Sequence, residues 1–240
     1  MIKNKPVIGI IPTFNINNPD NDPYLDRAYF VNLYEKMIAE AGGIPVGLLD
    51  LDINLYKDLC DGYLWPGGGY VNRYFFGLIE DALNNHKPML GICLGMQALS
   101  IYFNVLEDQK LDPSKSLEDT YQANKETNPY LIKMDEEKVS HHDHYVTYDE
   151  ESQNRALHNV LINKDSLMYD IYEKDAIQEP SMHTICVNRL PDSILVSAKT
   201  SDEVIEAIEI PDSNILGVQY HPELIGDPKL FEWLINKASK

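Results

Sequence analysis

In the first hundred residues, short apolar runs alternate with amphipathic stretches, and this alternation limits the folds open to the chain. The run Val7-Ile8-Gly9-Ile10-Ile11 is apolar on both faces, as a strand buried in a parallel sheet is. Further strand-like runs lie at residues 44–49, 63–65 and 89–92. Repeated alternation of strand and helix predicts a parallel sheet with helices on both faces. We therefore expect an α/β fold.

The stretches between these runs have the periodicity of helices. From Tyr24 to Ala41, apolar residues recur close to every 3.6 residues, and Gly42-Gly43 supply a C-terminal stop. Other helices are predicted at 53–59, 73–85, 94–103 and 227–238.

The pattern changes after Phe103. Residues 107–128 are polar and without a clear period, which predicts a long surface connection or lid. Strand-like runs then return, and we expect them to extend the sheet with antiparallel strands. They lie at 130–134, 158–162, 183–187, 194–198, 204–210 and 215–220. No repeat, linker or break in composition divides the chain, so one domain over residues 1–240 is expected.

The composition of the chain argues against several classes of partner. Of 240 residues, 20 are Lys or Arg and 38 are Asp or Glu, a formal net charge of −18 that disfavours nucleic acid and anionic membrane surfaces. The apolar run at the start ends at Pro12, too short for a signal peptide, and no window approaches membrane-spanning length. Cys60, Cys93 and Cys186 have no C-x-x-C spacing, so neither a disulfide framework nor a zinc site is indicated. A reducing cytoplasm fits best.

A candidate nucleophile stands between a predicted strand and a predicted helix. Gly91-Ile92-Cys93-Leu94-Gly95 has the G-x-C-x-G form of a nucleophile elbow, in which small flanking residues permit a strained central residue. The helix N-terminus at this turn favours the thiolate form of Cys93. A buried structural cysteine in a core strand is an equally good interpretation of this motif alone.

A candidate proton carrier follows another apolar strand. In Tyr220-His221-Pro222-Glu223, His221 could shuttle a proton and Glu223 could hold the imidazole in one tautomer. An isolated H-P-E is more often a solvated turn. Here both Cys93 and His221 follow predicted strands, and the carboxyl ends of parallel strands gather around one crevice. We therefore predict a Cys93–His221–Glu223 triad.

Two backbone amides are candidates for stabilising an oxyanion. One is the N–H of Leu94, just after the nucleophile, and the other is the N–H of Gly68 in the glycine loop after Trp65. The loop lacks G-K-[ST] and is not a P-loop, and by itself it would be interpreted as a tight turn. Gln97, four residues after Cys93, projects from the same helix face and is a candidate substrate ligand.

The three motifs, in this order, resemble the class I glutamine amidotransferase superfamily: P-G-G-G after a strand, G-I-C-L-G-M-Q, and G-V-Q-Y-H-P-E near the C-terminus. Within it the chain resembles the γ-glutamyl-γ-aminobutyrate hydrolase (peptidase C26) family over nearly its whole length. The resemblance implies a flavodoxin-like three-layer α/β/α fold with a mostly parallel central sheet and an antiparallel extension. It also implies no metal, no organic cofactor, and a γ-glutamyl thioester on Cys93 that water releases.

Some positions depart from the family pattern and concern the substrate. The family commonly shows G-G-G-D-V-N-P-x-x-Y-G, whereas this chain has Tyr70, Arg73 and Phe76 where the Asp, Pro and Tyr stand. A segment similar to N-S-x-H-H-Q keeps only Ser181 and His183. His183 is a candidate pocket residue, although a histidine on a strand is more often structural.

The cluster His141-His142-Asp143-His144 contains metal-ligand types, but adjacent strand residues point to opposite faces, so we do not expect a metal site. Three functions remain open: a hydrolase that cleaves a small γ-glutamyl amide, a glutaminase subunit that feeds ammonia to a separate synthase, and a catalytically silent binding protein of the same fold. The first is favoured, because nucleophile, base and acid are all present. The leaving amine and the oligomeric state, monomer or homodimer, stay open.

Overall fold

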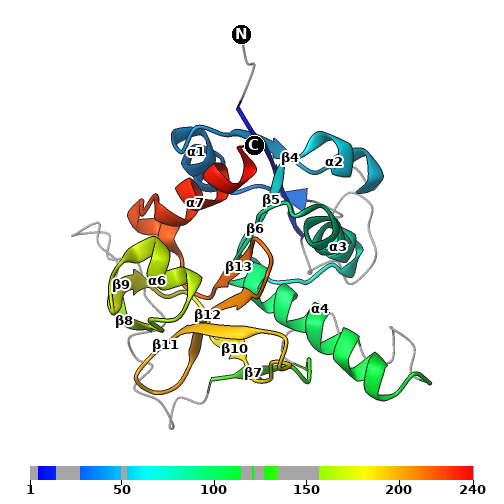
Figure 1. Ribbon diagram of the computed structural model, residues 1–240, viewed down its shortest axis with the longest axis vertical. Coiled ribbons are helices and arrows are strands. Elements are labelled where there is room, and N and C mark those ends of the chain that lie inside the picture. The colour runs from blue at the N-terminus through cyan, green and yellow to red at the C-terminus, as the bar shows by residue number, and fades with distance from the viewer. Residues whose placement is uncertain are drawn as a thin grey trace.

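A mixed nine-stranded sheet crosses the part of the protein that the computed structural model describes, residues 5–14, 28–49, 53–114, 121, 127–134 and 157–239 (Figure 1). Its order is β4 (Ile44–Gly47), β1 (Val7–Ile10), β5 (Gly62–Trp65), β6 (Met89–Ile92), β13 (Ile215–Val218), β12 (Ile205–Ile210), β11 (Leu195–Lys199), β8 (Leu157–Ile162) and β9 (Ala176–Pro180).

The first five strands in this order are parallel, and the remaining four are antiparallel to their neighbours. The parallel strands β5, β6 and β13 are buried at every position, as expected of strands that helices cover on both faces. The α/β fold with a parallel core and an antiparallel extension is therefore confirmed.

Helices form the two outer layers. α1 (Asn32–Glu40) and α7 (Lys229–Ala238) cover one face of the sheet, while α2 (Ile53–Leu59), α3 (Phe76–Asn85) and α4 (Leu94–Leu111) cover the other (Figure 1). A short helix, α6 (Leu167–Tyr172), packs beside the antiparallel strands. Each face has its own apolar core, one around Trp65 and Phe75 and one around Phe231 and Ile38.

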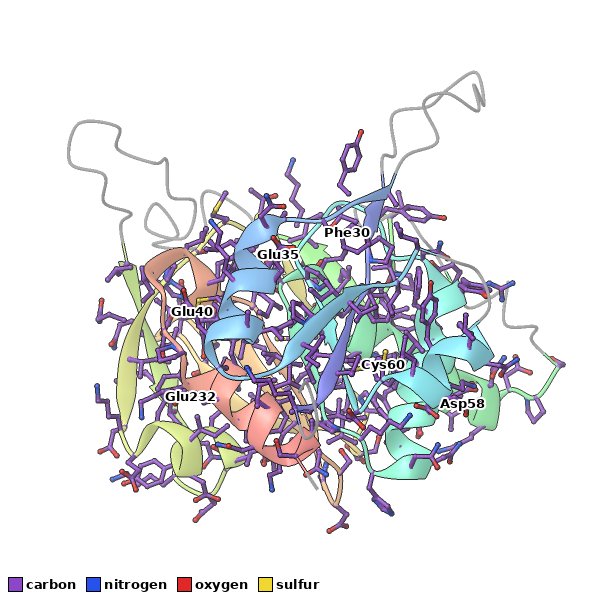
Figure 2. The ribbon with its side chains drawn as sticks, turned by 90° about the horizontal axis from the view of Figure 1, so that it is seen from above. Phe30, Glu35, Glu40, Asp58, Cys60 and Glu232 are labelled. Carbon is purple, nitrogen blue, oxygen red and sulfur yellow. The ribbon has the colours of Figure 1, made fainter. Side chains whose placement is uncertain are left out.

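The acidic excess of the sequence lies partly on the outer helix faces. Figure 2 shows Glu35 and Glu40 on α1 and Glu232 on α7, and all three are exposed. At the exposed end of β4, Gly47 leaves room for Phe30: a Cβ on Gly47 would lie 2.9 Å from the Phe30 ring. None of the described helices is long and apolar enough to cross a membrane.

The helix predicted from Tyr24 to Ala41 is wrong over residues 28–31, and residues 24–27 lie outside the described part of the chain. α1 begins at Asn32, and Ala28–Tyr29 form a strand, β3, that pairs with β2 (Thr13–Phe14). The periodic pattern could not reveal this pairing, because it depends on a segment distant in sequence.

The prediction for residues 107–128 is partly wrong. Helix α4 continues to Leu111, well beyond the predicted end at Phe103, because Tyr130 and Arg189 give its polar residue Asp108 tertiary partners. Within the helix predicted over residues 73–85, a single 3-10 turn, η1 (Arg73–Phe75), comes first, and α3 follows it.

Two predicted strands leave the main sheet. β7 (Leu131–Lys133) and β10 (Ile185–Val187) pair with each other, antiparallel, in a separate two-stranded sheet. Strand β9 and helix α6 were not predicted. Gln178 and Glu179 interrupt the apolar pattern of β9, and α6 spans only six residues, too few to show a helical period.

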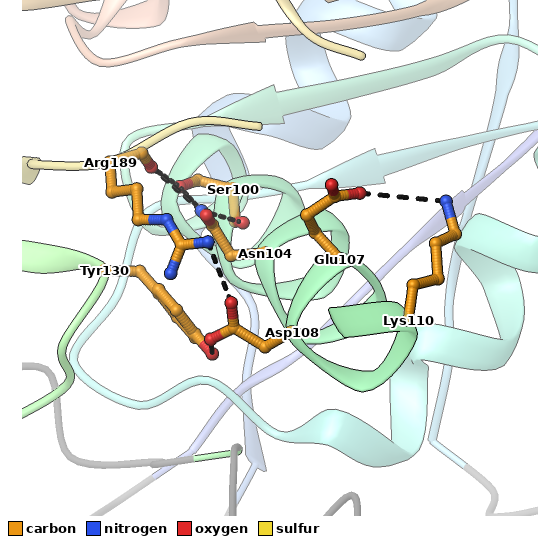
Figure 3. Close-up of polar contacts among 7 residues, drawn as sticks. All are labelled: Ser100, Asn104, Glu107, Asp108, Lys110, Tyr130 and Arg189. Atoms are coloured by element: carbon orange, nitrogen blue, oxygen red, sulfur yellow. Dashed lines mark hydrogen bonds and ion pairs between the residues drawn. The ribbon is translucent and has the colours of Figure 1, made fainter. Parts of the chain in front are cut away.

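A polar network joins this small sheet to α4. The Asn104 side chain donates hydrogen bonds to the carbonyl oxygens of Ser100 and Arg189, and Arg189 forms an ion pair with Asp108 at 2.8 Å (Figure 3). The Tyr130 hydroxyl donates to the same Asp108 carboxylate at 2.6 Å. These contacts fix the small sheet against helix α4.

Candidate active site

The sequence motifs lie at the carboxyl ends of three neighbouring parallel strands. β5 leads into the glycine loop, β6 leads into Cys93, and β13 leads toward His221, with Trp65 paired to Gly91 and Ile92 paired to Val218. The backbone N–H of Cys93 donates to the Val218 carbonyl at 2.7 Å, so the nucleophile strand stays in register to its last residue. Strand pairing thus brings together residues that are far apart in sequence.

Cys93 has a strained backbone. Its φ is 51° and its ψ is −100°, a left-handed conformation that costs of order 1–3 kcal/mol for a residue with a side chain. The flanking glycines make the turn feasible: a Cβ on Gly95 would lie 2.0 Å from the Trp65 carbonyl oxygen, and one on Gly91 would lie 2.6 Å from the Gly95 carbonyl carbon. The turn holds the thiol at the N-terminus of the 18-residue helix α4.

His221 and Glu223 form a tight pair at the end of β13. The imidazole Nδ1 lies 2.7 Å from Glu223 Oε1, and both side chains are buried. Burial lowers the pKa of His221, but the charge and hydrogen bond of Cys93, with those of Glu223, raise its pKa to about 10. With Nδ1 turned to Glu223, the other ring nitrogen serves Cys93. The imidazolium form of His221 is therefore favoured at neutral pH.

Tyr34 completes this arrangement, and the sequence did not single it out. Its hydroxyl donates to Glu223 Oε1 at 2.8 Å and accepts from the Gly67 N–H at 3.3 Å. Burial and Glu223 raise the pKa of Tyr34 well above its ordinary value, so the phenol stays a donor. The periodicity of α1 places Tyr34 on its apolar face, where it would be interpreted as a core residue.

The glycine loop lies close to the imidazole. A Cβ on Gly67 would approach His221 Cε1 to 2.8 Å, and one on Gly68 would approach Thr13 Cγ2 to 2.8 Å, so neither position has room for a side chain. The Thr13 hydroxyl donates to the Gly67 carbonyl at 3.0 Å and fixes the loop. The N–H of Leu94 is the first of helix α4, where backbone donors have no acceptor within the helix.

A pocket of about 290 Å³ opens over these residues. Gly68, Cys93 and His221 form one part of its lining, and residues 182–185 form the rest. The end of β9, just before the loop of residues 181–184, fixes the backbone of His221, whose N–H donates to the Pro180 carbonyl at 3.0 Å. The family resemblance indicated His183 as a pocket residue but gave no role to its neighbours Met182, Thr184 and Ile185.

Gln97 is fully buried and contacts the back of the pocket wall. Its amide nitrogen donates to the Ile185 carbonyl at 2.8 Å and to Gln219 Oε1 at 3.1 Å. Among the described residues, Gln97 is not one of those that line the pocket. The contacts shown position strand β10, and the expected substrate contact stays a proposal.

His183 lines the pocket and has a carboxylate behind it. Its Nε2 lies 3.5 Å from Glu206 Oε1, and His158 Nε2 lies 3.4 Å from Glu206 Oε2. Burial alone would raise the pKa of Glu206, but the two histidines lower it to about 2. Glu206 is therefore ionised at neutral pH.

Within the described residues, no group of three or more His, Cys, Asp or Glu side chains has an arrangement suited to a metal ion. The cluster His141-His142-Asp143-His144 lies outside the described residues. The three cysteines are free thiols and are buried.

A buried thiol lies on a strained strand-to-helix turn, beside a histidine that contacts a glutamate. This arrangement, in this fold, is typical of the amidotransferase-like hydrolases. The Peptidase C26 family model matches residues 72–223. RP404, a glutamine amidotransferase-like protein of Rickettsia prowazekii, is 30% identical over 283 aligned positions that include 100% of this chain and 99% of that protein. The chain belongs to the peptidase C26 family of the class I glutamine amidotransferase-like superfamily.

Two further similarities agree with this. A glutamine amidotransferase of Schizosaccharomyces pombe, PB2B2.05, is 27% identical over 232 positions, covering 85% of this chain and 81% of that protein. The glutaminase domain of Trypanosoma brucei CTPS, solved with bound acivicin, superposes with a TM-score of 0.64 at 20% identity, covering 98% of this chain and 94% of that one. The second likeness supports the fold alone.

Proposed function

We propose that this protein hydrolyses the γ-glutamyl amide bond of a small γ-glutamyl compound through a thioester on Cys93. One observation carries the proposal: a thiol at a strained helix N-terminus lies beside an imidazole whose Nδ1 is 2.7 Å from a buried carboxylate. A metal or organic cofactor has no part in it.

Acylation begins with attack of the Cys93 thiolate on the amide carbon. The amide oxygen gains negative charge, and the N–H groups of Gly68 and Leu94 are the proposed donors to it. His221, held as imidazolium by Glu223, then gives its proton to the leaving amine as the C–N bond breaks. A γ-glutamyl thioester and a free amine result.

Deacylation uses the same histidine in the opposite role. Neutral His221 takes a proton from water as the oxygen attacks the thioester carbon, and the C–S bond breaks to restore the thiolate. The products are glutamate and the imidazolium form of His221. Glu223 and Tyr34 keep the ring oriented through both halves of the cycle.

A glutaminase that feeds a separate synthase is the second candidate. It is the candidate suggested by the glutamine amidotransferase-like relatives in Rickettsia prowazekii and Schizosaccharomyces pombe. Such a subunit would hydrolyse glutamine fast only when its partner is bound. The silent-protein alternative gains nothing from the contacts at Cys93, since a binding protein needs no strained thiol.

A substrate panel separates these candidates. Purified protein is assayed against glutamine and γ-glutamyl amides of γ-aminobutyrate, a polyamine and an aromatic amine, and intact-mass spectrometry follows adducts at Cys93. Turnover of a γ-glutamyl amide with a transient mass increase of one glutamyl group supports the proposal.

The same panel contains the contrary outcomes. Turnover of glutamine that appears only when a co-purifying protein is added favours the synthase-coupled subunit. Cleavage by Cys93→Ala at the wild-type rate would refute the mechanism.

A further inference from the structure

Thr13 lies where the chain leaving β1 passes the glycine loop that follows β5. β1 and β5 are neighbouring parallel strands, and beyond the end of β1 the Ile11 N–H still donates to the Leu64 carbonyl at 2.9 Å. Thr13 follows in β2, where it pairs with Tyr29 of β3. Its hydroxyl donates to the Gly67 carbonyl at 3.0 Å. A residue that follows one strand therefore contacts the loop that follows the next.

The Gly67 carbonyl belongs to the same peptide group as the Gly68 N–H. A peptide group is planar, and none of the described peptide bonds is cis, so the C=O and N–H bonds of this group point in opposite directions. The partner of the Gly67 carbonyl therefore sets the direction of the Gly68 N–H. Because Thr13 lies on the carbonyl side, the N–H points away from Thr13.

This peptide group lies beside the nucleophile. A Cβ on Gly67 would lie 3.5 Å from Cys93 Cβ, and one on Gly68 would lie 3.1 Å from Leu94 Cδ2. Gly68 also lines the pocket that opens over Cys93. The two proposed donors to the oxyanion, the N–H groups of Gly68 and Leu94, thus belong to residues that lie side by side.

The loop itself restrains this peptide group little. It has a glycine on each side, and without a Cβ neither residue disfavours a rotated peptide plane as other residues do. The preceding peptide group has a partner of its own, since the Gly67 N–H donates to the Tyr34 hydroxyl at 3.3 Å. For the group between Gly67 and Gly68, Thr13 supplies a restraint that the glycines cannot.

We propose that Thr13 is a positioning residue whose hydroxyl holds the Gly67 carbonyl, so that the Gly68 N–H stays directed toward the oxyanion that forms at Cys93. This inference rests on the proposed function for the identity of the acyl group. A donor that is fixed before the reaction needs no reorganisation when the charge develops. Loss of the hydroxyl should therefore slow acyl transfer to Cys93 but leave other reactions of its thiol unchanged.

The first experiment needs no γ-glutamyl substrate. Cys93 is acetylated with p-nitrophenyl acetate and, separately, alkylated with iodoacetamide; both rates are followed on the Cys93 peptide by mass spectrometry and by release of p-nitrophenolate, with Cys93→Ala as background. Acetylation places negative charge on the ester oxygen as the C–S bond forms, and p-nitrophenolate then leaves with the electrons of the C–O bond. Alkylation displaces iodide and forms no oxyanion. Because both reactions need the thiolate, the ratio of acetylation to alkylation cancels changes in thiol reactivity and reports stabilisation of the oxyanion.

Thr13→Val removes the hydroxyl and is expected to lower this ratio about tenfold, less than the roughly 10²- to 10³-fold cost of removing an oxyanion donor outright. Thr13→Ser keeps a hydroxyl and should keep the wild-type ratio. Ser213→Ala is the matched control, because the Ser213 hydroxyl also donates to a backbone carbonyl, that of Ile210 at 2.8 Å. It lies in the turn before β13, at the opposite end of that strand from His221, and its loss should leave the ratio unchanged.

A wild-type ratio in Thr13→Val would overturn the proposal. An equal fall in Thr13→Ser would overturn it too, because the effect would then belong to the Thr13 methyl group, which lies beside Gly68. If Thr13→Val does not fold, Thr13→Ala takes its place with the same expected ratio, since it adds no atom at this partly exposed position. If the ratio falls as expected but the wild type cleaves no γ-glutamyl amide, the proposed function fails and the positioning role stands.

Steady-state kinetics on a γ-glutamyl amide give the second test. The bound substrate carries no oxyanion, and the charge develops only on the way to the tetrahedral intermediate. Thr13→Val should therefore lower kcat about tenfold with KM within about twofold, and Thr13→Ser should restore kcat. A rise in KM at an unchanged kcat would assign Thr13 to substrate binding and contradict the inference.

Discussion

His221 and His183 both line one pocket, and each has a glutamate behind it, but the two pairs are built differently. Glu223 is two residues from His221 and lies 2.7 Å from its Nδ1, so one carboxylate serves one imidazole. Glu206 comes from a separate strand and lies between two imidazoles at 3.4 and 3.5 Å. The short pair suits proton transfer, which needs a fixed ring, whereas the shared carboxylate links β12 to β8 and to the loop that carries His183. If this comparison is right, changes at the two pairs affect different kinetic constants.

The largest effect is expected at the nucleophile, on which both pairs act. Cys93→Ala removes the sulfur that forms the thioester, so kcat for γ-glutamyl amides should fall by about 10⁴-fold or more. Stopped assays with radiolabelled substrate can measure the small activity that remains. Cys60→Ala is the control, because Cys60 is also a buried free thiol but packs against Gly9, away from the pocket. Equal losses in both variants would mean that the thiols act through folding.

The next largest effects should distinguish the two histidines by the kinetic constant that each one changes. His221→Ala removes the proton carrier and is expected to lower kcat by about 10³-fold or more, almost as much as loss of the nucleophile, since triad members act as a unit. His183→Gln should mainly raise KM. Steady-state kinetics on one γ-glutamyl amide compare the variants directly. A pure KM effect for His221→Ala would reverse the roles assigned to the two pairs.

The two glutamates give a sharper comparison through pH. Contacts with Cys93 and Glu223 raise the pKa of His221 to about 10, so the imidazolium persists through neutral pH and is lost as the pH rises through that value. Glu223→Gln removes one of these contacts. It should lower kcat by about 10²- to 10³-fold and move the alkaline limb of kcat/KM to lower pH.

Glu206→Gln serves as the counterpart of that variant, because it replaces the carboxylate behind His183, the other histidine that lines the pocket. Its alkaline limb should stay where it is in the wild type. A shift of the limb in Glu206→Gln but not in Glu223→Gln would contradict the assignment of the proton carrier.

The same contrast explains what the sequence could predict. Cys93, His221 and Glu223 stand in short motifs at strand ends, where local spacing and the geometry of parallel sheets are enough to bring them together. Glu206 and His158 come together only because β12, β11 and β8 pair in an antiparallel register that periodicity does not specify. Both looked like ordinary polar positions of strands. His183 was found through family resemblance, not through its partners.

Tyr34 shows the same limit within the well-predicted pair. It comes from α1, which precedes the glycine loop in the sequence. The periodicity of that helix identified only its apolar face. A tyrosine in a core needs a partner for its hydroxyl, but the sequence does not say which. Here that partner is Glu223, which links the helix to the catalytic histidine.

The smallest effect tests this link. Tyr34→Phe keeps the ring in the core and removes one hydrogen bond to Glu223, so His221 should be held less firmly and kcat should fall by about threefold to tenfold. Tyr63→Phe is a close control, because the Tyr63 hydroxyl also donates to a buried carboxylate, that of Asp81 on α3, at 2.6 Å. Chemical denaturation should show each variant losing about 1–2 kcal/mol of stability, since each leaves a buried carboxylate one donor short. Only Tyr34→Phe should lose activity, and equal kcat values for the two variants would show that the hydroxyl supports the fold without orienting the acid.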